Sequence, residues 1–308
     1  MANNFINMAF MYNPMLSLNN IYADVIYELK AGKSGACVYE LSGNRILKVY
    51  PPRNHNGAFK TGDNQTKQKK YLRHCRYESS MTYIRSIRDI VMTMILPDNM
   101  SPKVYDYGFT ACKEGIQPFI VMEKVNGIEL FHYQPTGTDR DVRILLNIMV
   151  AFDKFNNTIK DVYSQTHSDI IEPCHKDLHP HNIFVNTETN EIKIIDFDLS
   201  ICPYDILRTN NFTSRKSLHN PFVNKILSNN IQATNQYTHY DVFKNVPKYI
   251  HDDADLYQVY SVFHYFFLHN KRLDLLLTEL KQVKTKEAFV QTSLKVLKSL
   301  MNHRKLRF

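Results

Sequence analysis

The stretch from Cys174 to Asp198 constrains this chain more than any other part of it. It reads Cys-His-Lys-Asp-Leu-His-Pro-His-Asn-Ile-Phe-Val, and Ile-Ile-Asp-Phe-Asp follows at 194–198. Two short apolar runs separated by a polar, turn-forming segment predict a hairpin of two strands. That hairpin would bring the side chains of Asp177, Asn182 and Asp196 into one neighbourhood.

These three side chains carry the oxygen atoms that phosphoryl transfer requires. Asparagine and aspartate oxygens are hard ligands that suit Mg²⁺, which keeps its remaining positions for water and phosphate oxygens. An aspartate five residues before the asparagine can accept the proton of an attacking hydroxyl. We therefore predict that Asn182 and Asp196 bind a metal and that Asp177 is the catalytic base, with an ordinary polar-ended hairpin as the alternative.

The pattern H-x-D-x-x-x-x-N followed by I-I-D-F resembles the catalytic core of the protein-kinase-like superfamily. The resemblance extends over roughly residues 22–270 and implies an α+β, two-lobed fold. Residues 1–124 would form a small antiparallel β-sheet lobe with one helix, and residues 125–308 a larger, mainly helical lobe. The implied cofactors are ATP and Mg²⁺, with Mn²⁺ as a substitute.

Lys48 lies in the middle of an apolar strand at 46–50, where a charge needs a partner. In the superfamily that the chain resembles, this lysine holds the nucleotide phosphates and pairs with a glutamate on the next long helix. Here a basic helix is predicted at 65–88, and Glu78 is its only acidic residue. The alternatives are an edge-strand lysine that faces water and a glutamate that makes only surface pairs.

A glycine-bearing turn connects the predicted strands at 25–29 and 37–41, and the strand that carries Lys48 comes after them. Such a turn lets backbone N–H groups approach phosphates closely. It departs from the G-x-G-x-x-G-x-V loop of protein kinases and looks closer to the loop of aminoglycoside-type phosphotransferases. The residues that would contact the nucleotide there are Gly32, Lys33, Ser34, Gly35 and Val38. A plain hairpin turn is the alternative.

The apolar run at 118–123 resembles the last strand of the small lobe, followed by the hinge. The resemblance places Met122 at the gatekeeper position. It also assigns the backbone of Glu123 and Val125 to the adenine edge of the nucleotide. A buried strand without a ligand is the alternative interpretation.

The remaining polar residues of the 174–198 stretch have less specific predicted roles. His175 is expected to brace the loop by hydrogen bonds. His179 stands where protein Ser/Thr kinases usually carry lysine, and it could contact the transferred phosphoryl group. We expect His181 to be an exposed loop residue. Asp198 replaces the glycine of D-F-G and is expected to face solvent, with a role as a further acidic ligand as the alternative.

Two long helices follow from the pattern of apolar residues. Residues 139–166 show a stripe at 3.6-residue spacing, which predicts a core helix. The segment that begins at Asp255 resembles the buried central helix of the large lobe, with Asp255 hydrogen-bonded to the catalytic-loop backbone. Asp205 is the alternative anchor, and no A-P-E motif is recognisable.

The acceptor of the phosphoryl group is harder to predict. Asp255 lies 59 residues after Asp196, and so long a link resembles protein kinases, whereas His179 and the glycine-bearing turn favour a small-molecule acceptor. We expect a divergent serine/threonine protein kinase. A small-molecule kinase of the aminoglycoside-phosphotransferase type and a pseudokinase that acts as a binding module are the alternatives.

Charge and cysteine content suggest partners and location. The chain has 38 Lys and Arg against 30 Asp and Glu, and residues 53–76 hold seven basic residues against one acidic residue. This segment could attract nucleic acid or another anionic partner, or simply be a solvated helix face. Five scattered cysteines and no membrane-length apolar run indicate the cytoplasm. The chain also resembles kinase-like proteins of large DNA viruses or intracellular pathogens, which would place it in the host cytoplasm.

Overall fold

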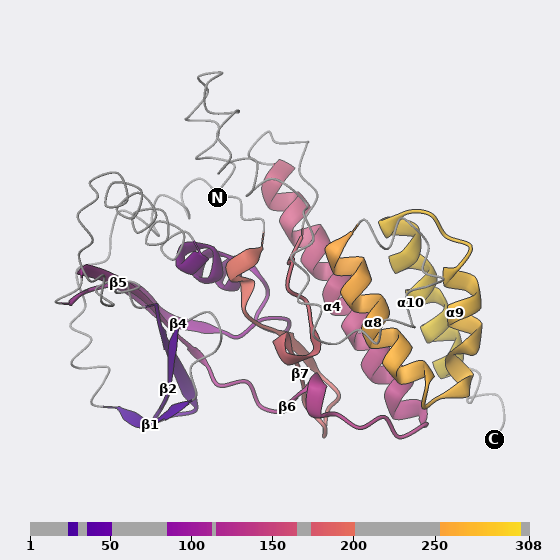
Figure 1. Ribbon diagram of the computed structural model, residues 1–308, viewed down its shortest axis with the longest axis horizontal. Coiled ribbons are helices and arrows are strands. Elements are labelled where there is room, and N and C mark those ends of the chain that lie inside the picture. The colour runs from indigo at the N-terminus through magenta and orange to yellow at the C-terminus, as the bar shows by residue number, and fades with distance from the viewer. Residues whose placement is uncertain are drawn as a thin grey trace, which may run out of the picture. The chain divides into compact units, whose positions relative to one another are not determined.

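The computed structural model describes residues 24–29, 36–50, 85–112, 115–164, 174–200 and 253–302 (Figure 1). The protein is α+β, with antiparallel sheets and several helices, as the sequence predicts. The chain divides into two compact units. The first comprises Met1–Met94 and Pro102–Lys124, and the second Ile95–Ser101 and Val125–Phe308.

The first unit contains a five-stranded antiparallel sheet with the strand order β1-β2-β3-β5-β4. In that order the strands are Val25–Leu29, Cys37–Leu41, Arg45–Val49, Gly115–Glu123 and Val104–Cys112. Leu47 and Val49 pack with Phe119 on one face. Because side chains alternate along a strand, Lys48 lies on the opposite face. There Ile120 packs with Ile90, which belongs to helical residues 85–95.

The second unit is mainly helical. Its described helices are α4 (Asp139–Ser164), α8 (Ala254–Phe267), α9 (Asp274–Leu280) and α10 (Lys286–Asn302). Of these, α10 packs against both α4 and α9 (Figure 1). The predicted core stripe of α4 is confirmed, since Val142, Phe152 and Ile159 are fully buried. None of the helices in these described ranges is both long and apolar enough to span a membrane.

A small antiparallel sheet in the second unit presents the 174–198 stretch. Its strands are β6 (Ile128–Glu129), β7 (Ile183–Val185) and β8 (Ile192–Ile194), in that order. The β7–β8 hairpin agrees with the prediction. Among the described residues, the 3₁₀ turns η1 (Leu130–His132), η2 (Pro180–Asn182) and η3 (Phe197–Leu199) adjoin the sheet. The 3₁₀ turn η6 (Lys271–Leu273) links α8 to α9.

Gly127 cannot carry a side chain without moving the β6–β7 pair. Its φ is +140°, and a Cβ atom there would lie 2.7 Å from Val185 C and 2.9 Å from Asn186 N. These neighbours are backbone atoms, and β7 is held between β6 and β8. Gly127→Ala should therefore lower the free energy of unfolding of the second unit by about 3 kcal/mol. Urea unfolding measures this loss.

Gly43→Ala is the control for backbone conformation alone. Gly43 has a φ of +72°, but the nearest atom to an added Cβ is Arg45 Nε at 3.7 Å. A loss of only about 1 kcal/mol is expected there. Equal losses for the two alanine variants would contradict the argument that overlap with β7 dominates at Gly127.

The first turn of α4 is organised around the buried carboxylate of Asp141. It accepts hydrogen bonds from the N–H groups of Thr136, Gly137 and Thr138, at 2.6 to 3.2 Å. Tyr133 also donates its hydroxyl to Asp141 Oδ1, at 3.0 Å. Burial raises the pKa of Tyr133 to about 12, and the hydrogen bond to Asp141 adds to the shift.

The raised pKa of Tyr133 predicts a pH-dependent stability difference. A tyrosine whose pKa rises on folding stabilises the protein below its unfolded pKa of 10.0, and this contribution is lost as the pH approaches 12. Tyr133→Phe should lower the free energy of unfolding by about 1 kcal/mol below pH 10. The difference between wild type and variant should shrink above that pH. Urea unfolding at several pH values tests this, and a constant difference would contradict it.

Candidate active site

Asp255 anchors the backbone of the 174–198 loop. Its carboxylate is fully buried and accepts hydrogen bonds from the N–H groups of His175, at 2.7 Å, and Lys176, at 2.8 Å. Asp253 caps α8 by accepting from the N–H groups of Asp255 and Leu256. The prediction that Asp255 anchors this loop is confirmed. Asp205, the alternative anchor, lies outside the described residues.

A partly buried lysine, Lys286, balances the acidic groups behind the loop. Lys286 Nζ lies 3.3 Å from Asp253 Oδ2. Burial lowers the pKa of Lys286, but the Asp255 and Asp253 carboxylates together raise it above its ordinary value. The lysine therefore stays charged. Burial also raises the pKa of the neighbouring Cys174 thiol well above its ordinary value, with Asp255 adding to the shift, so Cys174 is not poised as a thiolate nucleophile.

His175 braces the loop, as predicted. Its Nδ1 atom accepts from the N–H of Asp177 at 3.3 Å, and its Nε2 atom lies 3.2 Å from the Ile195 carbonyl oxygen. Because Nδ1 accepts and a carbonyl faces Nε2, the proton belongs on Nε2. The buried ring also packs on Phe197, with ring centroids 5.0 Å apart. His175 thus joins the loop that carries Asp177 to the strand end that precedes Asp196.

Asn182 hydrogen-bonds Asp177 and the backbone of Ile195, the residue before Asp196. Its Nδ2 atom donates to the Asp177 carbonyl oxygen at 2.8 Å and lies 3.5 Å from Asp177 Oδ2. The N–H of Ile195 donates to the Asn182 carbonyl oxygen at 2.9 Å, and Asp196 is the next residue. Since Nδ2 is engaged, Oδ1 is the atom of Asn182 that could bind a cation. The hairpin thus holds the segments carrying Asp177, Asn182 and Asp196 close together.

The backbone is strained at two positions among the predicted site residues, Lys176 and Asp196. Asp196 has φ +63° and ψ +63°, and Lys176, next to Asp177, has φ +67°. Residues other than glycine adopt this left-handed conformation at a cost of about 1 kcal/mol or more. Such strain persists where the surrounding structure holds it, and it concentrates at functional sites.

His179 lies beside Asp177. Its Nδ1 atom accepts from the N–H of His181 at 3.2 Å, so the proton of the neutral ring belongs on Nε2. That Nε2 atom lies 3.5 Å from Asp177 Oδ2. His179 can therefore orient the carboxylate of Asp177, in addition to the predicted contact with a phosphoryl group.

The expectation that His181 is an exposed loop residue is wrong. Its Nδ1 atom lies 2.5 Å from Glu129 Oε2, and its ring stacks on Phe131 with centroids 4.1 Å apart. The side chain is about one-third exposed. The cause is the position of η1 next to η2, a contact between segments far apart in the sequence.

The expectation that Asp198 faces solvent is also wrong. It is 4% exposed, and Phe197 in the same 3₁₀ turn, η3, is buried as well.

In the first unit, Lys48 forms a buried ion pair. Its Nζ atom lies 2.6 Å from Asp89 Oδ2, and both residues are less than a tenth exposed. The Tyr50 hydroxyl also hydrogen-bonds Asp89. Lys48 is therefore not an edge-strand lysine facing water, since β3 lies between β2 and β5. The acid shown to pair with it is Asp89, and the predicted partner, Glu78, lies outside the described residues.

The other predicted nucleotide contacts are located only in part. Gly32, Lys33, Ser34 and Gly35 lie outside the described residues. Val38, on β2, is the cross-strand partner of Lys48.

Met122 and Glu123 end β5, where the Glu123 N–H donates to the Lys103 carbonyl oxygen at 2.8 Å. That bond leaves the Glu123 N–H unavailable for a nucleotide. Val125 follows as the first residue of the longer segment of the second unit.

The sequence did not predict two features of these sites, the Lys48–Asp89 pair and the Glu129–His181 contact. Asp89 did carry a signal, because it is the only acidic residue of helical residues 85–95. Glu129 carried none, since its proximity to His181 depends on the pairing of β6 with β7.

Across the described residues, no group of three or more His, Cys, Asp or Glu side chains is arranged to hold a metal ion. The predicted ligands are instead one asparagine and one aspartate. Such a pair fits Mg²⁺, which takes one or two protein carboxylates and completes its octahedral shell with water and phosphate oxygens.

Comparison of the chain with protein-family models finds no match, and comparison with curated proteins finds none either. A functional interpretation therefore depends on the residues and their geometry.

Proposed function

We propose that this protein is an ATP·Mg-dependent phosphotransferase of the protein-kinase-like fold, which transfers the γ-phosphoryl group to a hydroxyl. The observation that supports this most strongly is the arrangement around Asn182. This residue contacts Asp177 through its side chain, and its carbonyl accepts from the residue before Asp196. A proton acceptor and two hard oxygen ligands on one hairpin are what phosphoryl transfer needs.

Each of these side chains has a defined task in the reaction. Asp177 orients the acceptor hydroxyl and takes its proton, and His179 and His175 hold Asp177 in place. Asn182 and Asp196 would hold Mg²⁺, which neutralises charge on the phosphate oxygens. In the first unit, Lys48, kept in place by Asp89, is the residue proposed to bind nucleotide phosphates. Positioning and charge neutralisation, rather than a covalent intermediate, supply the rate.

A serine/threonine protein kinase is the acceptor class that we favour, on the length of chain between Asp196 and Asp255. A small-molecule kinase is the second candidate, because His179 rather than lysine lies beside Asp177. Retention of Lys48, Asp177, Asn182 and Asp196 argues against a purely binding role.

A thermal-shift measurement tests the proposal directly. ATP with Mg²⁺ should raise the melting temperature by several degrees, because a ligand that binds only the folded state stabilises it. ATP with a chelator should have a much smaller effect. Incubation with labelled ATP and either a protein mixture or a metabolite pool then identifies the acceptor class. A shift independent of metal, with no transfer to either pool, would contradict a catalytic function.

The lysine of the first unit gives a second test. Lys48→Met alone would leave the Asp89 carboxylate buried and unpaired, which destabilises a protein. The double variant Lys48→Met/Asp89→Asn removes both charges and should fold. We expect its KM for ATP to rise, or its kcat to fall, by about 100-fold or more. Steady-state kinetics measure this.

Lys103→Met is the matched control, since Lys103 is exposed on the same unit. If the double variant and this control show the same small effect, Lys48 does not bind the nucleotide.

A further inference from the structure

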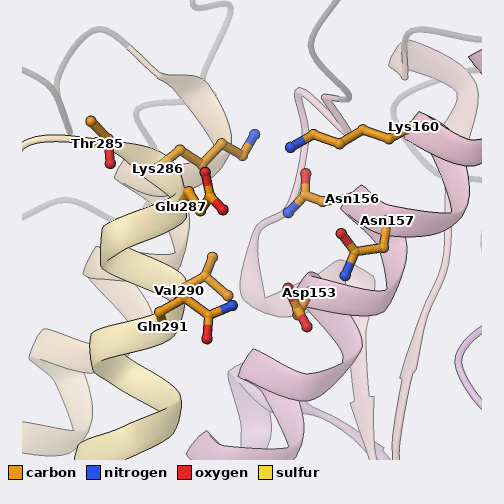
Figure 2. Close-up of a pocket in the computed structure, with 9 residues that line it drawn as sticks. All are labelled: Asp153, Asn156, Asn157, Lys160, Thr285, Lys286, Glu287, Val290 and Gln291. Atoms are coloured by element: carbon orange, nitrogen blue, oxygen red, sulfur yellow. The ribbon is translucent and has the colours of Figure 1, made fainter. Parts of the chain in front are cut away.

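In the second unit, a cavity of about 220 Å³ lies between α4 and the beginning of α10 (Figure 2). Its charged lining consists of two lysines and two acids. These are Lys160 and Asp153 from α4, and Lys286 and Glu287 from α10. None of the three residues assigned to phosphoryl transfer in this unit, Asp177, Asn182 and Asp196, lines the cavity.

One end of the cavity is suited to an anion. The amino groups of Lys160 and Lys286 point toward one another there (Figure 2). The ion pair of Lys286 with Asp253 offsets part of this positive charge, and a carboxylate between the two ammonium groups would reduce their remaining repulsion. The first turn of α10, a helix of 17 residues, adds the partial positive charge of its backbone N–H groups. Thr285 Oγ1 accepts from only one of these groups, the Ala288 N–H, at 3.1 Å.

A buried acceptor on α4 points to a ligand that also donates hydrogen bonds. Asn156 is 7% exposed, and its Nδ2 atom donates to the Phe152 carbonyl oxygen at 2.9 Å. Its Oδ1 atom has no hydrogen-bond partner in the described part of the chain. The amide projects from α4 toward α10, next to the two lysine amino groups (Figure 2). A buried acceptor without a donor is costly, so a donor supplied by a ligand would be favourable here.

We propose that this cavity binds a small zwitterion of the α-amino acid class. The carboxylate of the ligand lies between Lys160 and Lys286 at the first turn of α10. Its ammonium group donates to Asn156 Oδ1 and to the carboxylates of Asp153 and Glu287. The lining carries equal numbers of positive and negative side chains, which matches a ligand that carries one charge of each sign. The cavity is also smaller than the pockets of about 300–1,000 Å³ that hold drug-sized ligands.

Occupancy of this cavity is coupled to the loop that carries Asp177. Lys286 lies 3.3 Å from Asp253 Oδ2, and Asp253 caps the helix whose Asp255 holds the backbone of His175 and Lys176. A ligand that fixes Lys286 also fixes this chain of contacts. Amide hydrogen exchange at His175 and Lys176 should therefore become slower when the ligand binds.

Calorimetric titration of the full chain tests the binding itself, independently of any phosphotransferase activity. The probes are the individual protein amino acids, with propionate, propylammonium and inorganic phosphate as ligands that carry only one sign of charge. At least one amino acid should bind more tightly than all three of these. Lys160→Gln and Asp153→Asn should each weaken that binding by about tenfold or more.

Lys154→Gln is the matched control, because Lys154 is exposed on the same helix and does not line the cavity. It should leave the affinity unchanged. Circular dichroism verifies that the variants fold. The proposal is overturned if no amino acid binds. It is also overturned if phosphate or propionate binds as tightly as the best amino acid and Asp153→Asn has no effect, since the cavity is then a simple anion site.

Discussion

Asp196→Asn is expected to lower kcat for phosphoryl transfer by about 1,000-fold, which corresponds to about 4 kcal/mol of transition-state stabilisation. The change removes the single full negative charge of the proposed ligand pair, because Asn182 contributes only a neutral oxygen. An amide is nearly the same size as a carboxylate, so the fold should survive. Asparagine also tolerates the left-handed conformation of residue 196, whose φ is +63°. Single-turnover kinetics with ATP and Mg²⁺ measure the loss.

Glu188→Gln is the matched control for this prediction. It makes the same carboxylate-to-amide change at the exposed turn of the same hairpin. Activity close to wild type is expected for Glu188→Gln, and raised Mg²⁺ should restore part of the activity of Asp196→Asn, since a weakened site fills at higher metal concentration. If Asp196→Asn retains more than about a tenth of the wild-type rate, Asp196 does not hold the metal in the transition state.

The elements that the sequence predicts best are those whose pattern is local. The stripe of α4 repeats every 3.6 residues, and the structure has a helix over Asp139–Ser164 against a predicted 139–166. The β7–β8 hairpin follows from two apolar runs around a polar turn. Asp255 is predicted as an anchor only through the resemblance of its helix to a known one, and no local pattern identifies its partners 79 and 80 residues away.

The residues whose predictions are wrong depend on contacts between distant segments. His181 is polar and adjoins a proline, which is typical of an exposed turn, but β6 and η1 bring Glu129 and Phe131 against it. Asp198 is buried, as is Phe197 in the same 3₁₀ turn, η3. No sequence periodicity predicts the contacts of His181 or the burial of Asp198, since both depend on which surface another segment covers.

In the first unit, the acidic partner of Lys48 is likewise fixed by a contact between segments that are distant in the sequence. A lysine between apolar neighbours in a strand predicts an acid nearby, and Asp89 is such an acid. Which acid is near depends on the position of a helix over the sheet. The described helical residues extend to 95, beyond the predicted end at 88, and Asp89 lies directly after that end. The apolar run that follows Asp89, residues 90–96, holds only one polar residue, Thr93, so it shows no polar face that would mark an amphipathic helix.

Asp255→Asn is expected to lower the free energy of unfolding of the second unit by about 3 kcal/mol. The carboxylate accepts one hydrogen bond on each oxygen, from the N–H groups of His175 and Lys176. An asparagine offers one acceptor, and its NH₂ group would face the second N–H, so two donors would meet in a site without solvent. Relief requires the loop backbone to move, and that displaces Asp177. The rate of phosphoryl transfer should therefore fall by about 100-fold or more even where the variant is still folded.

Asp274→Asn separates this effect from the general loss of an acid near a helix N-terminus. Asp274 lies in the first turn of α9 and is exposed, so its replacement should cost about 0.5 kcal/mol and leave the rate unchanged. Urea unfolding and single-turnover kinetics on both variants give the comparison. A structural role limited to α8 would lower the stability of Asp255→Asn without changing the rate of its folded fraction. We expect stability and rate to fall together, because the Asp255 carboxylate holds the N–H of the strained Lys176, the residue directly before Asp177.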